Sequence, residues 1–90
     1  MQTELDGKFL LNVYALVEKH GEPAATPFGN GFTLQGLTVA PGFDGYDVYL
    51  FSNKVQLTLG FHNKWHADAK NEQEMDDFIS LLSAIRHQYG

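Results

Sequence analysis

The two ends of the chain carry hydrophobic residues at intervals of three and four positions, the spacing of an amphipathic helix. The first set is Leu5, Phe9, Leu10, Val13, Tyr14, Leu16 and Val17. The stretch from Thr3 to Asp6 resembles a capping box, although Gly7 also favours Asp6 itself as the N-cap. Because Gly21 can cap the C-terminal end and Pro23 follows it, the pattern predicts a helix that ends near His20.

The second set lies near the C-terminus and predicts another helix. It consists of Met75, Phe78, Ile79, Leu82 and Ile85. Asn71 to Glu74 again resembles a capping box, and Arg86 and His87 place positive charge near the other end. The acidic residues among residues 72–77 are therefore explained as the solvated first turns of a helix. The alternative is that they bind a basic partner.

Alternating hydrophobic and polar positions between the helices predict three strands, over residues 32–40, 46–52 and 55–62. In the first strand, the alternation changes phase at Gln35-Gly36, and a β-bulge there would put the hydrophobic residues on both sides of it on one face. Residues 21–31 contain two prolines and three glycines, so we expect a loop.

A turn at Asn53-Lys54 would place Leu50 opposite Leu57, Val48 opposite Leu59 and Tyr46 opposite Phe61. Hydrophobic residues then meet throughout one face of the hairpin. The sequence predicts one domain over residues 1–90, a two-layer α+β fold of order α-β-β-β-α. A three-stranded antiparallel meander carries both helices on one face.

The opposite face of that sheet is the predicted interaction surface. It would carry Tyr49, Phe51, Gln56, Thr58 and His62, with Trp65 beside it. Two large aromatic residues on a solvated face form a patch of the kind that contacts a partner. The alternative is that they only cover each other as cross-strand neighbours. A chain of 90 residues folds with a small stability margin, so a homodimer is one form that such a contact could take.

Composition narrows the partners further. Eleven Asp and Glu outweigh six Lys and Arg, which gives a net charge of −5 and argues against nucleic acid as a partner. The N-terminus has no signal-peptide pattern and no segment is apolar enough to span a membrane, so we expect a cytoplasmic protein with no membrane partner. The chain has no cysteine, which excludes disulfides and thiolate chemistry.

One motif suggests chemistry, the stretch GFHNKWHAD at residues 60–68, in which His62, His66 and Asp68 could bind a metal ion. The sequence lacks the helical HExxH pattern, and Phe61 continues the buried alternation of the preceding strand, which turns His62 to the open face. The alternative is that the histidines bond locally while Trp65 covers an edge of the core. Serines and paired carboxylates do not form a recognisable catalytic arrangement, so we expect no enzyme, no catalytic residue and no cofactor.

The segments YDVYLF and VQLTLGFHNKWH resemble a family of small bacterial proteins of unknown function, in which a helix precedes a hairpin that ends in FHN-x-x-H. The resemblance covers much of the chain. It implies a bacterial, cytoplasmic, single-domain protein and gives no catalytic residues. We therefore expect a non-enzymatic regulatory or interaction domain that binds a protein partner, or a second copy of itself, through the open sheet face. A small-ligand or metal-binding protein that uses His62, His66 and Asp68, and an acidic inhibitor of a basic partner, are the alternatives.

Overall fold

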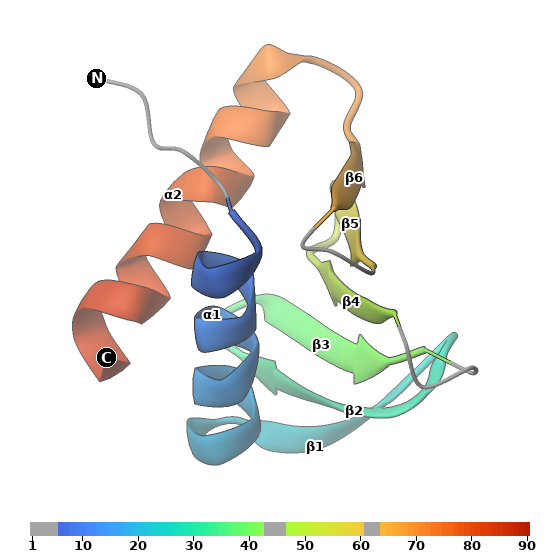
Figure 1. Ribbon diagram of the computed structural model, residues 1–90, viewed down its shortest axis with the longest axis vertical. Helices are drawn as coiled ribbons and strands as arrows, with labels where there is room; N and C mark the ends of the chain where they lie inside the picture. The colour runs from blue at the N-terminus through green and yellow to red at the C-terminus, as the bar shows by residue number, and fades with distance from the viewer. Residues whose placement is uncertain (1–5, 43–46, 61–63) are drawn as a thin grey trace.

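The computed structural model describes residues 6–42, 47–60 and 64–90. It is an α+β fold with two helices, α1 (Gly7–His20) and α2 (Glu72–Tyr89), and one antiparallel sheet (Figure 1). Along the chain, α1 comes before all the strands of the sheet and α2 comes after them. The strands are β1 (Glu22–Thr26), β2 (Gly29–Leu34), β3 (Leu37–Pro41), β4 (Val48–Phe51), β5 (Gln56–Leu59) and β6 (Trp65–Asp68). They follow one another in the sheet in chain order, so the predicted meander has six strands rather than three.

Both helices begin directly after a residue that was predicted as an N-cap, and α1 ends at His20 as predicted. The Asp6 carboxylate accepts a hydrogen bond from the Phe9 backbone N–H at 2.7 Å, which makes Asp6 the N-cap of α1. Thr3 lies outside the described residues. In α2, the Asn71 side chain accepts from the Glu74 N–H at 2.9 Å. Each cap satisfies a backbone donor that the helix itself leaves without a partner.

The predicted loop over residues 21–31 is wrong, because these residues form β1 and the first part of β2. Thr26 pairs with Gly29 across the turn residues Pro27 and Phe28. Prolines and glycines indicate a turn, but proline is also tolerated in a strand at the edge of a sheet, and β1 is such a strand.

The predicted bulge at Gln35-Gly36 is also wrong. These residues have φ values of +52° and +90° and form a two-residue hairpin turn, so the predicted first strand is two strands, β2 and β3. Leu34 pairs with Leu37 and Phe32 with Val39. The hydrophobic residues do share one face, as expected, but a hairpin rather than a bulge brings them there.

The hairpin of β4 and β5 has the predicted register. Leu50 pairs with Leu57 and Val48 with Leu59, and the Ser52 N–H donates to the Val55 carbonyl at 2.9 Å around the turn. The pairing of Tyr46 with Phe61 lies outside the described residues. The sequence did not predict β6, whose Ala67 pairs with Leu57 and whose Trp65 pairs with Leu59.

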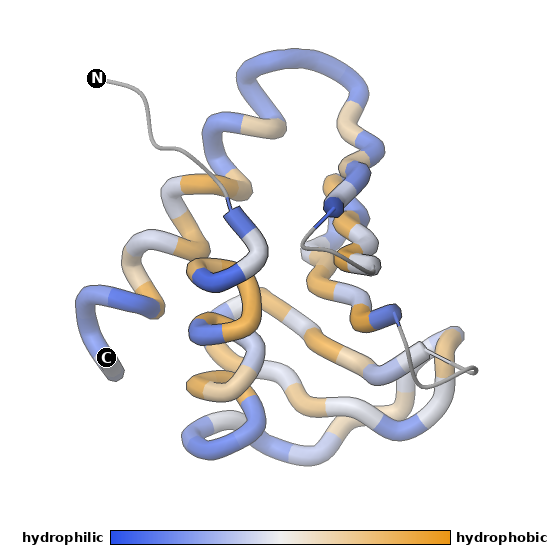
Figure 2. Tube along the Cα trace, in the orientation of Figure 1, coloured by the Kyte–Doolittle hydropathy of each residue, from blue (hydrophilic) through white to orange (hydrophobic). Residues whose placement is uncertain are grey.

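The hydrophobic core lies between the helices and one face of the sheet, as expected (Figure 2). The sheet contributes Val39, Leu50 and Leu57 from neighbouring strands, and all three are fully buried. The helices contribute Leu10, Val13 and Val17 from α1 and Phe78, Leu82 and Ile85 from α2. Every one of these residues is one that the periodicity assigned to an inward face.

In Figure 1, β1 to β3 run crosswise to β5 and β6, and β4 takes an intermediate direction between them. Gly31 on β2 is buried, and a Cβ atom there would overlap the Val39 carbonyl oxygen. Only glycine lets the backbones of β2 and β3 approach this closely. Neither α1 nor α2 combines the length and hydropathy that a membrane-spanning helix needs.

Candidate functional site

The face of the sheet opposite the helices forms two rows of side chains across neighbouring strands. Within each row, every residue pairs with the next one on the neighbouring strand. One row consists of Thr38, Phe51, Gln56 and Asp68, and the other of Ala40, Tyr49, Thr58 and His66. We call the part of this face on β4, β5 and β6 the open face, and define it as Tyr49, Phe51, Gln56, Thr58, His66 and Asp68. Four of these residues were predicted from the alternation, whereas His66 and Asp68 join them because β6 is a strand.

The aromatic end of the open face is covered from within the chain. Phe28, in the turn of the β1–β2 hairpin, stacks on Tyr49 with ring centroids 4.0 Å apart and planes at 13°. It also meets Phe51 edge-on, with centroids 5.6 Å apart. The three rings are partly buried and form a cluster that fixes the hairpin over β4. The interpretation in which the two aromatics are covered within the chain is therefore confirmed in part, because the covering ring is that of Phe28.

The other end of the open face is polar and solvated. His66 Nε2 lies 3.2 Å from Asp68 Oδ1, and the two side chains are 77% and 74% exposed. They share a face because they are two residues apart on β6. Thr58, opposite His66, is half-buried, and Gln56, opposite Asp68, is exposed. The surface thus passes from a rigid aromatic cluster to groups that donate and accept hydrogen bonds.

Trp65, which the sequence placed beside this surface, lies on the other side of the sheet. It pairs with Leu59, which faces the helices, and its side chain remains 39% exposed. This position agrees with the interpretation in which the tryptophan covers an edge of the core.

The predicted metal site is only partly described. The structure brings His66 and Asp68 together, while His62 lies outside the described residues. Within residues 6–42, 47–60 and 64–90, no three His, Asp or Glu side chains gather closely enough to hold a metal ion. Two exposed ligands leave half of the four positions of a tetrahedral Zn²⁺ ion to water or to other groups.

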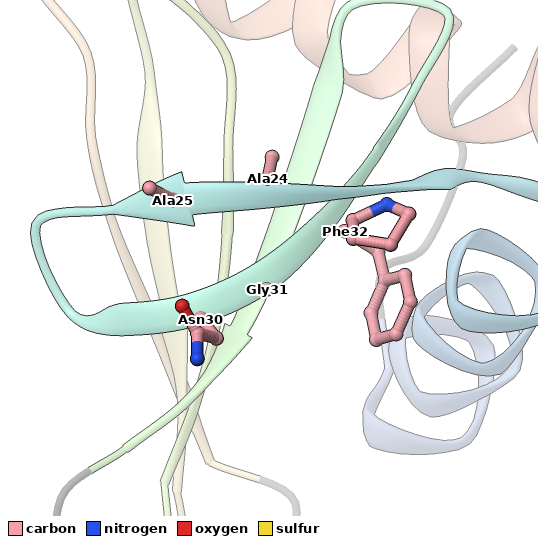
Figure 3. A pocket seen from close by; sticks show the side chains of 6 residues that line it. Ala24, Ala25, Asn30, Gly31 and Phe32 are labelled. Carbon is pink, nitrogen blue, oxygen red and sulfur yellow. The ribbon is translucent and has the colours of Figure 1, made fainter.

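A hollow of about 400 Å³ lies on the β1–β2 hairpin (Figure 3). Its lining consists of Pro23, Ala24, Ala25, Asn30, Gly31 and Phe32. None of these side chains titrates or acts as a nucleophile. The hollow can therefore receive an apolar group but offers no acid, base or charged ligand.

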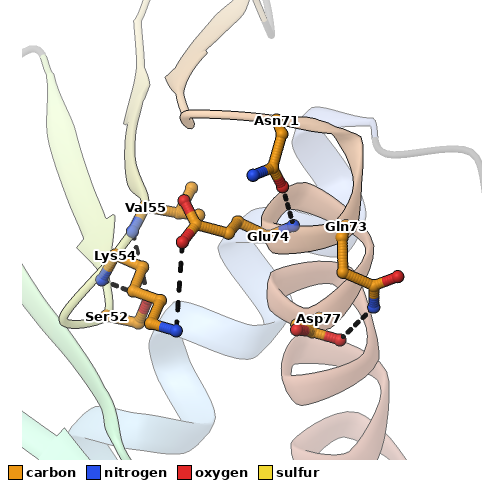
Figure 4. A network of polar contacts seen from close by, with 7 residues as sticks. All are labelled: Ser52, Lys54, Val55, Asn71, Gln73, Glu74 and Asp77. Atoms are coloured by element: carbon orange, nitrogen blue, oxygen red, sulfur yellow. Dashed lines mark hydrogen bonds and ion pairs between the residues drawn. The ribbon is translucent and has the colours of Figure 1, made fainter.

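The start of α2 meets the β4–β5 turn through a polar network (Figure 4). Lys54 Nζ lies 3.9 Å from Glu74 Oε2, and the Glu74 side chain is only 17% exposed. Ser52 Oγ accepts from the backbone N–H groups of Lys54 and Val55. Glu74 is therefore turned inward to hold the turn, and the exposed acids of the predicted acidic face are Glu72, Asp76 and Asp77.

The sequence did not assign Phe28 to the open face, and β6 was not recognised as a strand. The neighbours of Phe28, Pro27 and Gly29, were part of the predicted loop, and a loop does not show which face a ring reaches. For β6, the alternation of Trp65, His66, Ala67 and Asp68 was the available signal. It is only four residues long and was masked by the metal-like spacing of the histidines.

Comparison with known proteins gives a family without an assigned activity. The family described as "Protein of unknown function (DUF3081)" matches residues 5–90. No curated protein matches the chain, and no solved structure does. The match covers both helices and the whole described sheet, in agreement with the resemblance noted from the FHN-x-x-H segment. The chain therefore belongs to the DUF3081 family of proteins of unknown function.

Proposed function

We propose that this chain is a non-enzymatic protein-interaction module that binds a partner protein on its open face. The observation that carries the proposal is the continuity of that face, from the Phe28, Tyr49 and Phe51 cluster to exposed polar groups on β5 and β6. Interfaces are enriched in rigid aromatic residues flanked by polar groups of this kind.

The charge of the open face favours protein over nucleic acid. Its six residues include one acid, Asp68, and no lysine or arginine, and the whole chain carries a net charge of −5. Binding to phosphate depends on neutralisation by cations. A cytoplasmic location, which the cysteine-free composition accommodates, is part of the same proposal.

Catalysis is not part of the proposal, since acids at the start of α2 have structural roles. Glu74 pairs with Lys54, and Asp77 Oδ1 accepts a hydrogen bond from Gln73 Nε2 at 3.0 Å. The other acid of the first turn, Glu72, is exposed and stabilises the N-terminus of α2 through the helix dipole.

Site-specific photo-crosslinking in the cells that naturally make the protein tests this proposal. A photoreactive amino acid at Gln56, which is exposed on the open face, should give one discrete adduct with another protein. The matched control places it at Asn12, which is exposed on α1. Gln56→Arg should weaken co-purification of the same partner while leaving the circular dichroism spectrum unchanged. Equal adducts from both positions, or none from Gln56, would contradict the proposal.

A further inference from the structure

The two outer edges of the sheet differ in their ability to accept another strand. In the β1–β2 hairpin, Thr26 pairs with Gly29 across a two-residue turn, which makes this a hydrogen-bonded pair. The alternation then directs the backbone groups of Pro23 and Ala25 away from β2. Since proline has no N–H, β1 lacks a donor at the position where a further strand would need one.

β6 forms the other edge, and it contains no proline. The Gly60 N–H donates to the Lys64 carbonyl at 2.7 Å, which makes Gly60 and Lys64 a hydrogen-bonded pair. Alternation directs the backbone groups of His66 and Asp68 toward β5, and those of Ala67 away from it. The N–H and C=O of Ala67 are therefore oriented to pair with another strand.

We infer that β6 pairs antiparallel with β6 of a second copy of this chain, centred on His66. In this register each Lys64 lies opposite Asp68 of the second copy, so the dimer contains two oppositely charged cross-strand pairs. Lys64 and Asp68 are exposed in the single chain. Ala67 lies opposite Trp65 of the second copy, which places a small side chain against a large one on the helix-facing side.

The charges along the strand select this register over its neighbour. Centring the pairing on Ala67 would keep the same faces together but would place Lys64 opposite Lys70 of the second copy, a pair of like charges. An unrelated partner strand would not be expected to match this pattern, whereas β6 matches itself through a two-fold axis.

The resulting assembly is closed. Pairing at β6 uses the edge strand that contains no proline, whereas Pro23 protects the β1 edge of each copy from further addition. The pairing also joins the two open faces side by side and adds buried surface to a small domain. The inference goes beyond the proposed function, because it concerns the edge of the sheet and is measured on the purified chain alone.

A charge exchange tests the register. Sedimentation equilibrium over a concentration series should show a monomer–dimer equilibrium for the unaltered chain. Lys64→Glu and Asp68→Lys should each weaken the dimer about tenfold or more, because each creates two like-charge pairs. The double variant should restore the affinity to within about threefold, since it re-forms both pairs with their signs exchanged.

Lys19→Glu is the matched control, because Lys19 is exposed on α1 and the substitution changes the charge equally. It should leave the equilibrium unchanged, and circular dichroism checks that every variant is folded. A chain that stays monomeric at all concentrations would overturn the inference. So would equal weakening by Lys19→Glu, no recovery in the double variant, or tighter association of Lys64→Glu, which would indicate the Ala67-centred register.

Discussion

The contact of Phe28 with the open face makes a quantitative prediction about stability. Its ring stacks on Tyr49 at 4.0 Å and meets Phe51 at 5.6 Å, and the side chain is half-buried. Truncating a fully buried Phe to Ala costs about 3–5 kcal/mol, so a half-buried ring should contribute about half of that. Phe28→Ala should therefore lower the free energy of unfolding by about 2 kcal/mol and the Tm by about 10 °C.

Two further variants separate stacking from general burial. Phe28→Leu keeps an apolar side chain but removes the ring contacts, so it should cost about 1 kcal/mol. A double-mutant cycle of Phe28→Leu with Tyr49→Leu should show a coupling free energy of about 1 kcal/mol. Leu11→Ala is the control, because Leu11 is apolar but 48% exposed, and it should change stability by less than about 0.5 kcal/mol.

Urea unfolding at one fixed protein concentration measures these values, since self-association would otherwise contribute to apparent stability. Far-ultraviolet circular dichroism and Trp65 fluorescence should report the same transition if unfolding is two-state. A loss for Phe28→Ala no larger than that of Leu11→Ala would refute the packing of the hairpin over β4. Additive effects of the two leucine substitutions would refute the stacking contact.

Three more predictions concern glycines, pH and metal. Gly31→Ala should destabilise the protein far more than Gly36→Ala. A Cβ atom at Gly31 would overlap the Val39 carbonyl oxygen, whereas a Cβ atom at Gly36 would meet open space, and only the φ of +90° there opposes the substitution. We expect about 1 kcal/mol for Gly36→Ala in urea unfolding, and equal losses at both positions would contradict the close approach of β2 and β3 at Gly31. Burial, and to a smaller extent the Glu18 carboxylate, raises the pKa of Tyr14 above its ordinary value of 10.0. The stability linked to the Tyr14 proton is fully present below about pH 10 and is lost as the pH rises through the folded-state pKa. Tyr14→Phe should therefore reduce the loss of unfolding free energy at alkaline pH. An unchanged loss would contradict a raised pKa of Tyr14. Calorimetric titration with Zn²⁺ should give a Kd weaker than about 1 μM, and tighter binding that His66→Ala abolishes would instead support the metal-site alternative.

The sequence alone determined the elements whose signals are local. Asp6 and Asn71 are N-caps because a short polar side chain can reach a backbone N–H three residues later. The helical faces follow from the spacing of residues such as Val13 and Leu82. The pairing of Leu50 with Leu57 follows from the strict alternation of the β4–β5 hairpin, since a slip of one residue would expose every core side chain.

Only the tertiary structure decided the rest, because it depends on contacts between residues far apart in the chain. β1 contains proline and alanine and has little strand propensity of its own, so its pairing with β2 forms it. β6 is short and becomes recognisable only beside β5, which also moves His66 and Asp68 onto the open face and Trp65 off it. The stacking of Phe28 on Tyr49 joins two segments far apart in the chain. The close approach of β2 and β3 at Gly31 likewise depends on the neighbouring strand rather than on any local preference.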